Sequence, residues 1–354
     1  MNALNDVLFE EVLGKEGHLG LITLNRPQVL NSLSHQMIHL LFAQLKTWAN
    51  ASHIKAVIIQ AKDGRAFCAG GDLRLTYERY KNHDPLLTTF FRDEYLLNRL
   101  IFHFPKPYIA LLDGITMGGG VGISINGSHR VATDKLLFAM PETGIGFFPN
   151  VCGTYFLPRL PNKIGYYLGL TGARLTCDDC VSLGLATHKV AREKLPELIQ
   201  VLAETPLGDD SKTKVNQIIS TWNTSFQPSP LLEMQSVFNT CFSLPSMEDI
   251  LDALRQSKES VCQEAVSMLN KKSPTSLKIT LQAFQESKNL NFDACMQQEY
   301  RLSSRFVEGH DFIEGIRAVI IDKDLTPHWQ PNSLREVTNL MIDKYFSPLT
   351  HELI

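Results

Sequence analysis

A cluster of four glycines, Gly118, Gly119, Gly120 and Gly122, restricts how this chain can fold more than any other feature of its sequence. It follows residues 108–112, an apolar run that predicts a buried strand. Glycine lets a ligand or a neighbouring backbone approach closely, because no Cβ stands in the way. If a helix begins at the cluster, its first N–H groups lack intrahelical acceptors and can bind developing negative charge. The glycines could instead serve only tight helix packing, and the cluster alone leaves both interpretations open.

One carboxylate, Glu142, follows the cluster between a proline and a threonine. A carboxylate near an anion-binding backbone is typical of acyl chemistry, in which one part holds the oxyanion and the other handles the proton or acts as nucleophile. Burial beside Phe147 and Phe148 would raise the pKa of Glu142 towards neutrality. The alternative is a glutamate in a surface loop after Pro141.

The composition is that of an ordinary globular protein. Of 354 residues, 44% are hydrophobic and 20% are charged, and the formal net charge is -3. The sequence has no basic stripe of the kind that would indicate nucleic-acid binding. It also has no apolar run that approaches the roughly 20 residues of a membrane span. The first residues include acids and lack the cationic and apolar regions of a leader. We therefore expect a cytoplasmic protein, or a mitochondrial matrix protein if a transit peptide has been removed.

Cysteines and histidines give no pattern of metal ligands. Seven cysteines in a chain of this length do not indicate a disulfide scaffold, and the eleven histidines show no ligand spacing. The close pair Cys177 and Cys180 lacks a second pair of ligands. Thr176 instead predicts a helix N-cap, with Asp179 completing a capping box. We therefore expect no metal site.

Strand and helix signals alternate over the first half of the chain and then give way to helix alone. Helical spacing predicts helices after Ser34, over Leu86–Phe104 and after Asn150. Beyond about residue 190 the strand signals fade, and prolines mark a linker near residues 227–230. The sequence predicts an α/β domain over residues 1–225 and a C-terminal helical extension over residues 226–354. Apolar runs predict the strands at 19–25, 56–59, 108–112, 130–133, 136–139 and 186–190.

The glycine motifs exclude several enzyme classes and resemble one. The cluster lacks the trailing Gly-Lys-Ser/Thr of a P-loop and the glycine spacing of a dinucleotide site, and no Gly-x-Ser-x-Gly elbow is present. Three segments, RAFCAGGD at 65–72, MGGGVG at 117–122 and MPET at 140–143, together resemble the crotonase (enoyl-CoA hydratase/isomerase) superfamily. Further segments extend the resemblance over nearly the full chain, and it is closer to the branch of 3-hydroxyisobutyryl-CoA hydrolases.

This resemblance implies a fold, a substrate class and a set of site residues. The fold would be an α/β spiral of repeated ββα units followed by C-terminal helices, and the substrates would be coenzyme A thioesters. Backbone N–H groups of Ala69 and Gly119 would form an oxyanion hole, each donor typically worth ~3–4 kcal/mol in the transition state. Coenzyme A would be part of the substrate, with no separate cofactor. Relatives often assemble as homo-oligomers.

The resemblance also assigns two carboxylates. Glu142 matches the catalytic glutamate, which would either attack the thioester carbon and form an anhydride or deprotonate an attacking water. Glu94 matches a substrate-contacting glutamate and lies in the helix predicted over Leu86–Phe104. Its alternative is a solvated helix face or an ion pair with Arg99 or another basic neighbour.

Two positions bear on the reaction. Hydratases of the superfamily use two glutamates around one water, and Gly122 occupies the first of those positions. The hydrolases carry an aspartate where this chain has Asn150, within the segment PNVCG at 149–153. Asn150 can hydrogen-bond a substrate hydroxyl or a water but cannot act as a base, and its alternative role is to cap the following helix. Cys152 stands where the hydrolases have a glycine, and its side chain adds bulk near Asn150.

We therefore expect an acyl-CoA thioester hydrolase, with the resemblance implying 3-hydroxyisobutyryl-CoA and valine catabolism. Glu142 and Asn150 would be catalytic, and Glu94 and Gly119 would join them in substrate binding. Two alternatives stay open. One is an enoyl-CoA hydratase or isomerase that uses Glu142 alone, and the other is a non-catalytic acyl-CoA-binding protein.

Overall fold

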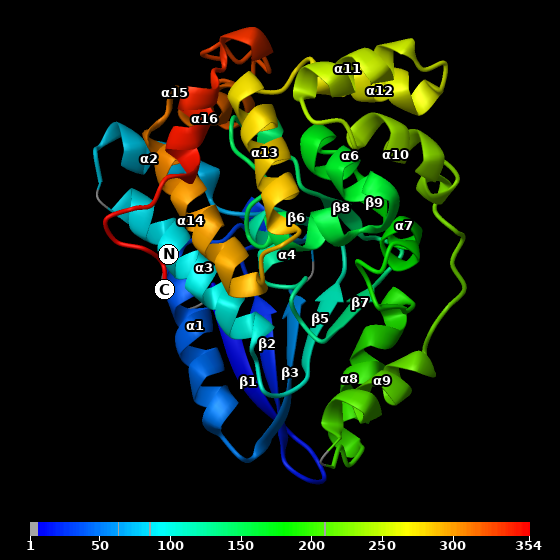
Figure 1. Cartoon of the computed structure of the whole chain (residues 1–354). Coiled ribbons are helices and arrows are strands. Elements are labelled where there is room, and N and C mark those ends of the chain that lie inside the picture. The colour runs from blue at the N-terminus through cyan, green and yellow to red at the C-terminus, as the bar shows by residue number, and fades with distance from the viewer. Residues whose placement is uncertain (1–5, 63, 85, 209) are drawn as a thin grey trace. The chain divides into compact units, whose positions relative to one another are not determined.

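The computed structural model describes residues 6–62, 64–84, 86–208 and 210–354 (Figure 1). The chain forms two compact units, each assembled from separate segments. The second unit ends with a segment that begins near residue 226, the predicted start of the C-terminal extension. It also includes two segments that lie within residues 1–225, the predicted α/β domain. The first unit contains the residues up to Gly71, Leu96–Phe138 and Leu175–Ser229, and the second contains Asp72–Tyr95, Ala139–Arg174 and Pro230–Ile354.

Two sheets form the frame of the first unit. The larger has the order β1-β2-β3-β5-β7-β10, in which β1 and β2 are antiparallel and the other neighbours are parallel. The smaller has the order β4-β6-β8-β9. The strands are β1 (Val7–Leu13), β2 (His18–Leu24), β3 (Ile54–Ala61), β4 (Ala66–Cys68), β5 (Tyr108–Leu112), β6 (Ile115–Met117), β7 (His129–Ala132), β8 (Leu137–Ala139), β9 (Leu175–Thr176) and β10 (His188–Lys189).

Consecutive strands alternate between the two sheets. The strands β3, β5 and β7 belong to the larger sheet, and the strand that follows each of them belongs to the smaller. A helix then follows each pair: α2 (Leu73–Lys81), α4 (Gly119–Gly122) and, after a 3-10 turn, α5 (Gly153–Phe156). This repeated ββα connection confirms the predicted spiral.

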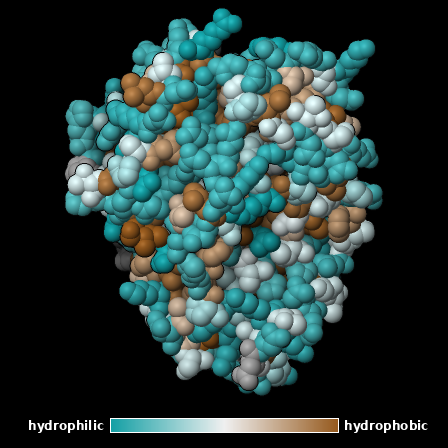
Figure 2. Space-filling model, in the orientation of Figure 1, coloured by the Kyte–Doolittle hydropathy of each residue, from teal (hydrophilic) through white to brown (hydrophobic). Residues whose placement is uncertain are grey.

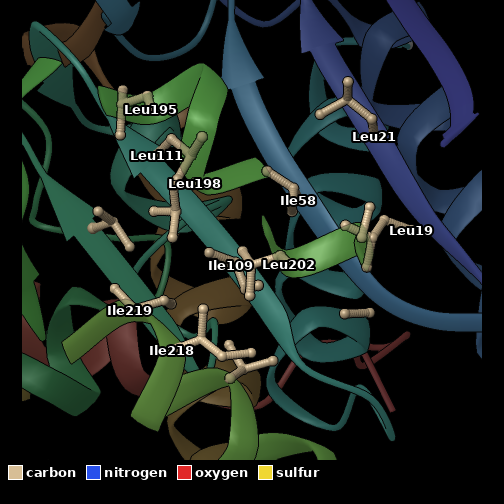
Figure 3. Packing of buried hydrophobic residues seen from close by; sticks show 14 of the residues in the cluster. Leu19, Leu21, Ile58, Ile109, Leu111, Leu195, Leu198, Leu202, Ile218 and Ile219 are labelled. Carbon is tan, nitrogen blue, oxygen red and sulfur yellow. The ribbon is translucent and has the colours of Figure 1, made fainter. Parts of the chain in front are cut away.

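Helices cover both faces of the larger sheet within the first unit. Hydrophobic side chains of β2, β3 and β5 pack against α8 (Leu195–Glu204) and α9 (Ser211–Ser220), as the close-up in Figure 3 shows. On the other face lies α1 (His35–Asn50), whose N-cap Ser34 accepts a hydrogen bond from the Met37 N–H at 3.2 Å, as predicted. A Cβ at Gly20 of β2 would lie 2.6 Å from the Trp48 ring of α1, so glycine is needed where this helix meets the sheet.

The second unit is helical. Its longest members are α13 (Pro274–Ser287), which is largely buried, and α14 (Phe292–Glu308). The first part of α3 (Leu86–Phe102) also belongs to this unit. Its other helices are α2, α5, α6 (Ile164–Thr171), α10 (Gln235–Phe242), α11 (Met247–Gln256), α12 (Ser260–Leu269), α15 (His310–Ile316) and α16 (Asn339–Phe346).

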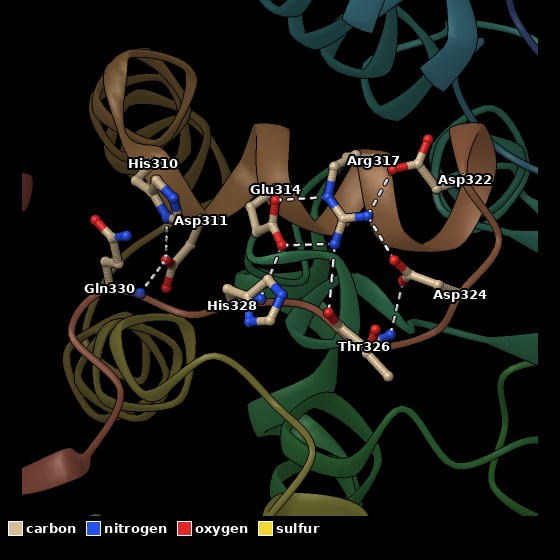
Figure 4. Close-up of polar contacts among 9 residues, drawn as sticks. All are labelled: His310, Asp311, Glu314, Arg317, Asp322, Asp324, Thr326, His328 and Gln330. Carbon is tan, nitrogen blue, oxygen red and sulfur yellow. Dashed lines mark hydrogen bonds and ion pairs between the residues drawn. The ribbon is translucent and has the colours of Figure 1, made fainter.

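Ion pairs of Arg317 hold the chain that follows α15 against that helix (Figure 4). Its guanidinium forms ion pairs with Glu314, Asp322 and Asp324 at 2.6–2.8 Å. Glu314 in turn accepts a hydrogen bond from the His328 N–H at 2.8 Å. A planar guanidinium that bonds several carboxylates at once restricts the backbone more than an isolated surface pair does. The segment around residues 322–328 is therefore held by one side chain.

Hydrophilic residues predominate on the face shown in Figure 2, and hydrophobic residues occur there in small separate groups. None of the described helices combines the length and the apolar character needed to cross a membrane. No disulfide joins the seven cysteines, all of which are buried. The capping box predicted at Thr176 and Asp179 is present at the start of α7 (Cys177–Ser182).

Candidate active site

The two glycine loops of the first unit pack directly on each other. A Cβ at Gly120 would lie 2.2 Å from the carbonyl oxygen of Cys68, so only glycine allows this contact. Gly118, the N-cap of α4, has φ 49°, and Gly70 of the first loop has φ 110°, both readily adopted by glycine. A Cβ at Gly70 would lie 3.6 Å from the Gly119 nitrogen, which places the first N–H of α4 beside the first loop.

The Ala69 N–H is already engaged within the fold. It donates a hydrogen bond to the carbonyl oxygen of Leu30 at 3.0 Å, which counts against the predicted role of Ala69 as an oxyanion donor. Two residues later, Gly71 pairs with Leu33 in an isolated parallel bridge. Within the described part of the chain, neither the Gly71 N–H nor the Gly119 N–H donates a hydrogen bond. Both groups remain able to bind an anion.

Glu142 opens a 3-10 turn, η3 (Glu142–Ile145), in the second unit. Its side chain is buried, with 5% exposed, and neither carboxylate oxygen has a hydrogen-bond partner among the described residues. Burial raises the pKa of Glu142 to about 8, and the charges of Glu299 and Glu94 add to this shift. The residue's own backbone and the charge of Lys272 act in the opposite direction. The predicted burial and raised pKa of Glu142 are therefore confirmed, and the surface-loop alternative is wrong.

Close backbone contacts with α15 hold the Glu142 turn. The turn ends at Gly146, with φ 69°, where a Cβ would lie 2.1 Å from the Asp311 carbonyl oxygen. A Cβ at Gly315 would lie 2.3 Å from the backbone of Ile145. The Asp311 carboxylate accepts hydrogen bonds from the Ser273 hydroxyl at 2.6 Å and from the Gln330 N–H at 2.8 Å. The C-terminal helices thus determine where Glu142 lies.

Aromatic rings surround the segment that follows this turn. The ring centroid of Phe147 lies 4.5 Å from that of Phe312 and 5.3 Å from those of Phe91 and Phe306. Phe148 stacks on Phe306 at 5.5 Å. All five rings are buried. This cluster excludes water from the neighbourhood of η3, which is the condition under which a carboxyl group loses its charge most readily.

Lys272 is a basic residue near Glu142 that the sequence did not reveal. Burial lowers its pKa to about 8, and the charge of Glu142 partly offsets that shift. Its Nζ lies 3.1 Å from where a Cβ of Gly144 would be, so the glycine in the turn leaves room for the ammonium group. Lys272 is the charge that favours the ionised form of Glu142.

Glu94 lies on α3 and is buried, with 2% exposed. Its Oε1 has no hydrogen-bond partner among the described residues, and burial raises its pKa to about 8, with a further contribution from Glu299. The alternative of a solvated helix face is therefore wrong. A buried carboxyl group with an unpaired oxygen suits contact with a polar ligand.

Asn150 faces the neighbouring residue of that helix. Its Nδ2 donates a hydrogen bond to the Tyr95 hydroxyl at 3.0 Å, and the side chain is 6% exposed. It does not cap the next helix, because the N-cap of α5 is Cys152. Burial and the charges of Glu299 and Glu94 raise the pKa of Tyr95 well above its usual value, so the phenol stays protonated. The amide of Asn150 is thus held beside a neutral hydroxyl.

Glu299 of α14 is a third buried carboxylate, and sequence reasoning missed it. It accepts hydrogen bonds from the Cys152 N–H at 2.9 Å, the Thr154 N–H at 3.0 Å and the Thr154 hydroxyl at 2.7 Å. These bonds hold a backbone in which Val151 and Cys152 have φ values of 49° and 77°. Burial nevertheless raises the pKa of Glu299 to about 7. Glu299 therefore fixes the segment that carries Asn150.

A sequence profile described as Enoyl-CoA hydratase/isomerase matches residues 19–346. The chain belongs to the enoyl-CoA hydratase/isomerase family. It is 44% identical to the human protein named 3-hydroxyisobutyryl-CoA hydrolase, mitochondrial, over 99% of this chain and 91% of the human one. The rat protein of the same name is 46% identical over 96% of this chain and 89% of its own length.

Solved structures of this family share the fold over nearly the full chain. A carnitinyl-CoA dehydratase from Mycobacterium thermoresistibile has a TM-score of 0.89 and 37% identity, and covers 99% of this chain and 98% of its own. An enoyl-CoA hydratase from Rhodobacter sphaeroides 2.4.1 has a TM-score of 0.87 and 33% identity, with 97% and 98% covered. Proteins similar to this chain thus carry the names of hydrolases and of hydratases.

The buried carboxyl groups of this chain lie in the second unit rather than beside the glycine cluster. Gly122, where the hydratase pattern implies a glutamate, is the last residue of α4. Among the described residues, the four buried carboxyl groups, Glu94, Glu142, Glu299 and Asp311, all lie in the second unit. Glu299 accepts hydrogen bonds on both of its oxygens. Glu94 and Glu142, in contrast, have carboxylate oxygens without a hydrogen-bond partner among the described residues. The unpaired oxygens of Glu94 and Glu142 are thus left able to bind a ligand or a water.

Proposed function

We propose that this protein hydrolyses acyl-CoA thioesters and that its substrate is 3-hydroxyisobutyryl-CoA, an intermediate of valine catabolism. The observation that carries the proposal is Glu142, a buried carboxylate whose two oxygens have no partner among the described residues. A carboxylate without hydrogen bonds is a stronger base and nucleophile than a solvated one. The names of the relatives at 44% and 46% identity support the same substrate.

We propose Gly119 and Gly71 as the oxyanion donors. Gly119 keeps its predicted role, whereas the bond from the Ala69 N–H to Leu30 favours Gly71 as the donor from the first loop. Two N–H groups aimed at one oxygen stabilise the tetrahedral intermediate, in which that oxygen becomes negative. The donors would bind the carbonyl oxygen of the thioester.

Glu142 would act in one of two ways. As a nucleophile, its carboxylate adds to the thioester carbon, the C–S bond breaks with release of coenzyme A thiolate, and water hydrolyses the resulting anhydride. As a general base, it takes a proton from the water that attacks the same carbon. In both cases the ionised form is active, and Asn150 and Glu94 would bind the polar end of the acyl group.

Hydration of an enoyl thioester is the second function that an observation favours. Glu94 and Glu142 are both buried, and both have a pKa of about 8, so they could supply the acid and the base that hydration needs. The two solved structures named above are also called dehydratase and hydratase. A non-catalytic acyl-CoA-binding protein has less support, since Asn150 is the only feature that favours it.

Two assays run in parallel on the same enzyme distinguish these functions. Release of free coenzyme A is followed with 3-hydroxyisobutyryl-CoA and other short acyl-CoA esters, and loss of the enoyl chromophore is followed with crotonyl-CoA. We expect coenzyme A release from the branched hydroxyacyl ester to exceed hydration. Faster hydration would assign the chain to the hydratases, and binding of both esters without turnover would favour the non-catalytic alternative.

The proposal also covers the cofactor, the assembly and the location of the enzyme. We propose that it needs no cofactor, that coenzyme A enters as part of the substrate and leaves as the free thiol, and that the chain forms a homo-oligomer. We propose a cytoplasmic location, with the mitochondrial matrix as the alternative because the human and rat relatives are named as mitochondrial proteins.

A further inference from the structure

Three potential metal ligands lie close together within the first unit, where β1 ends and β2 and β3 begin. The Oε2 of Glu11 lies 3.4 Å from the Nδ1 of His18 and 3.1 Å from the Nε2 of His53. The three ligand atoms all lie within 4.8 Å of one another. The two imidazole rings meet edge to face, with centroids 5.3 Å apart. No part of the proposed hydrolysis uses this cluster.

The backbone holds the three residues in place. Glu11 lies on β1 and His18 begins β2, and the antiparallel register pairs Leu13 with His18. Glu11 and Leu13 point to the same side of the sheet, because side chains alternate along a strand. The His18 N–H donates a hydrogen bond to the His53 carbonyl oxygen at 2.7 Å, which joins the two histidines through the main chain. The cluster therefore does not depend on long flexible side chains meeting by chance.

Trp48 orients the carboxylate. Its indole Nε1–H donates a hydrogen bond to the Oε1 of Glu11 at 3.0 Å, and the indole is buried, with 1% exposed. The bond leaves the other oxygen, Oε2, facing the histidines. A carboxylate held by a hydrogen bond and placed beside two imidazole nitrogens offers ligand atoms that zinc commonly binds.

We propose that Glu11, His18 and His53 form a zinc-binding site. Bonds of about 2.0–2.2 Å in a tetrahedron separate neighbouring ligand atoms by about 3.3 Å. The two distances from the Glu11 oxygen, 3.1 and 3.4 Å, already match that value. Three protein ligands leave the fourth position to water. The ion would join the hairpin of β1 and β2 to the start of β3.

The proposal is tested by calorimetric titration of Zn²⁺ into the full chain after treatment with a chelator. We expect one ion per chain at the site and an increase in the melting temperature when it binds. The variants His18→Ala and His53→Ala should each lower the affinity at least about tenfold. Glu11→Gln should have a similar effect, since its amide oxygen can still accept the Trp48 bond but the charge is lost. The exposed His351→Ala serves as the control and should bind zinc as the parent does.

A second pair of histidines could also bind zinc, and a variant of that pair distinguishes the two sites. His35 and His39 lie one turn apart on α1, with ring centroids 4.4 Å apart. The titration is therefore repeated in a His39→Ala background, where the site should persist. The inference is overturned if the parent binds no zinc in the micromolar range, or if the double variant of His18 and His53 binds it equally well. Thioester hydrolysis is not the readout, so failure here leaves the proposed function untouched.

Discussion

Glu94, Glu142 and Glu299 are buried in the same unit, and burial is the largest cause of the raised pKa of each. A neutral carboxyl group tolerates a water-poor environment better than a charged one. The charge of Glu299 also raises the pKa of the other two. The reactivity of Glu142 therefore depends on a side chain of α14, far from it in the sequence.

Substitution of Glu299 by glutamine should change both stability and the pH profile. The amide would leave one of the N–H groups of Cys152 and Thr154 without an acceptor, at a cost of about 1–3 kcal/mol in the free energy of unfolding. Loss of the negative charge should lower the pKa of Glu142, so the rising limb of the pH–rate curve moves to lower pH. Urea unfolding and rates between pH 6 and 9 measure the two effects. The control is Glu308→Gln at the exposed end of the same helix. An unchanged pH profile in Glu299→Gln would show that Glu299 acts only as a structural acceptor.

Substitution of Asn150 by aspartate should move the pH profile in the opposite direction. The new carboxyl group would replace the amide that donates to the Tyr95 hydroxyl and would add a negative charge among the buried glutamates. Like charges raise the pKa of Glu142, so the rising limb should move to higher pH. The exposed Asn289→Asp is the matched control. A large gain in hydrolysis at a fixed pH would instead show that the native asparagine marks an altered substrate preference.

The sequence predicted Glu142, Glu94 and Asn150 as site residues because each lies in or near a motif that can be recognised along the chain. It did not predict Glu299, whose hydrogen-bond partners Cys152 and Thr154 lie 147 and 145 residues away. Burial of Glu94 was also not foreseen, since it follows Arg92 and Asp93 and the helix pattern alone allows an exposed position. Pairings at such distances depend on how α14 packs, which no local pattern encodes.

Elements with strong local signals were predicted well. The helix capped by Ser34 and the capping box at Thr176 formed as expected, because these caps involve residues only three positions apart. The strand predicted over 186–190 is reduced to His188–Lys189. The helix expected after Asn150 is the four-residue α5, whose N-cap Cys152 lies in the left-handed region. Short elements such as these are set by tertiary contacts rather than by the spacing of apolar residues.

The contact between the two glycine loops can be tested with one methyl group. In Gly120→Ala the Cβ would collide with the Cys68 carbonyl, so we expect a loss of about 1–3 kcal/mol in stability and a severe loss of hydrolysis. Gly64→Ala is the control, because its Cβ would make only ordinary contacts, with the Cβ of Pro27 at 3.4 Å and the Lys62 carbonyl oxygen at 3.7 Å. Urea unfolding and coenzyme A release report the two effects. Full activity in Gly120→Ala would mean that the loops need not touch for catalysis.

At the scale of the whole molecule, the predicted spiral is present, and the division into domains at residue 225 stays a prediction. The predicted boundary near residue 225 follows the loss of strand signals. In the structure, residues 72–95 and 139–174 group with the C-terminal helices instead. The contacts of Gly146 and Gly315 explain part of this grouping, since they join the Glu142 turn to α15. Contacts of backbone with backbone leave no periodic trace in a sequence.

The buried glutamates also predict how stability depends on pH. Glu94 and Glu142 have a pKa of about 8 in the folded chain and an ordinary value of 4.5, so the folded state holds protons that the unfolded state has lost between these values. Stability should therefore fall as the pH rises towards 8. The buried His129, with its pKa lowered to about 4 from 6.5, has the opposite effect only below pH 6.5.

Urea midpoints measured between pH 6.5 and 8 test this dependence where the carboxyl groups dominate. We expect the midpoint to fall across that interval and the fall to be smaller in the double variant Glu94→Gln, Glu142→Gln, which cannot ionise at either position. A midpoint that stays constant or rises in the parent protein would contradict the raised pKa values.

The most direct test of the central claim is the rate of coenzyme A release from 3-hydroxyisobutyryl-CoA by the parent enzyme and by Glu142→Gln. Glutamine has nearly the same shape but is neither a base nor a carboxylate nucleophile, so the substitution should leave folding intact. We expect a rate lower by about 10²–10⁴-fold. Hydrolysis by Glu142→Gln at close to the parent rate would contradict it.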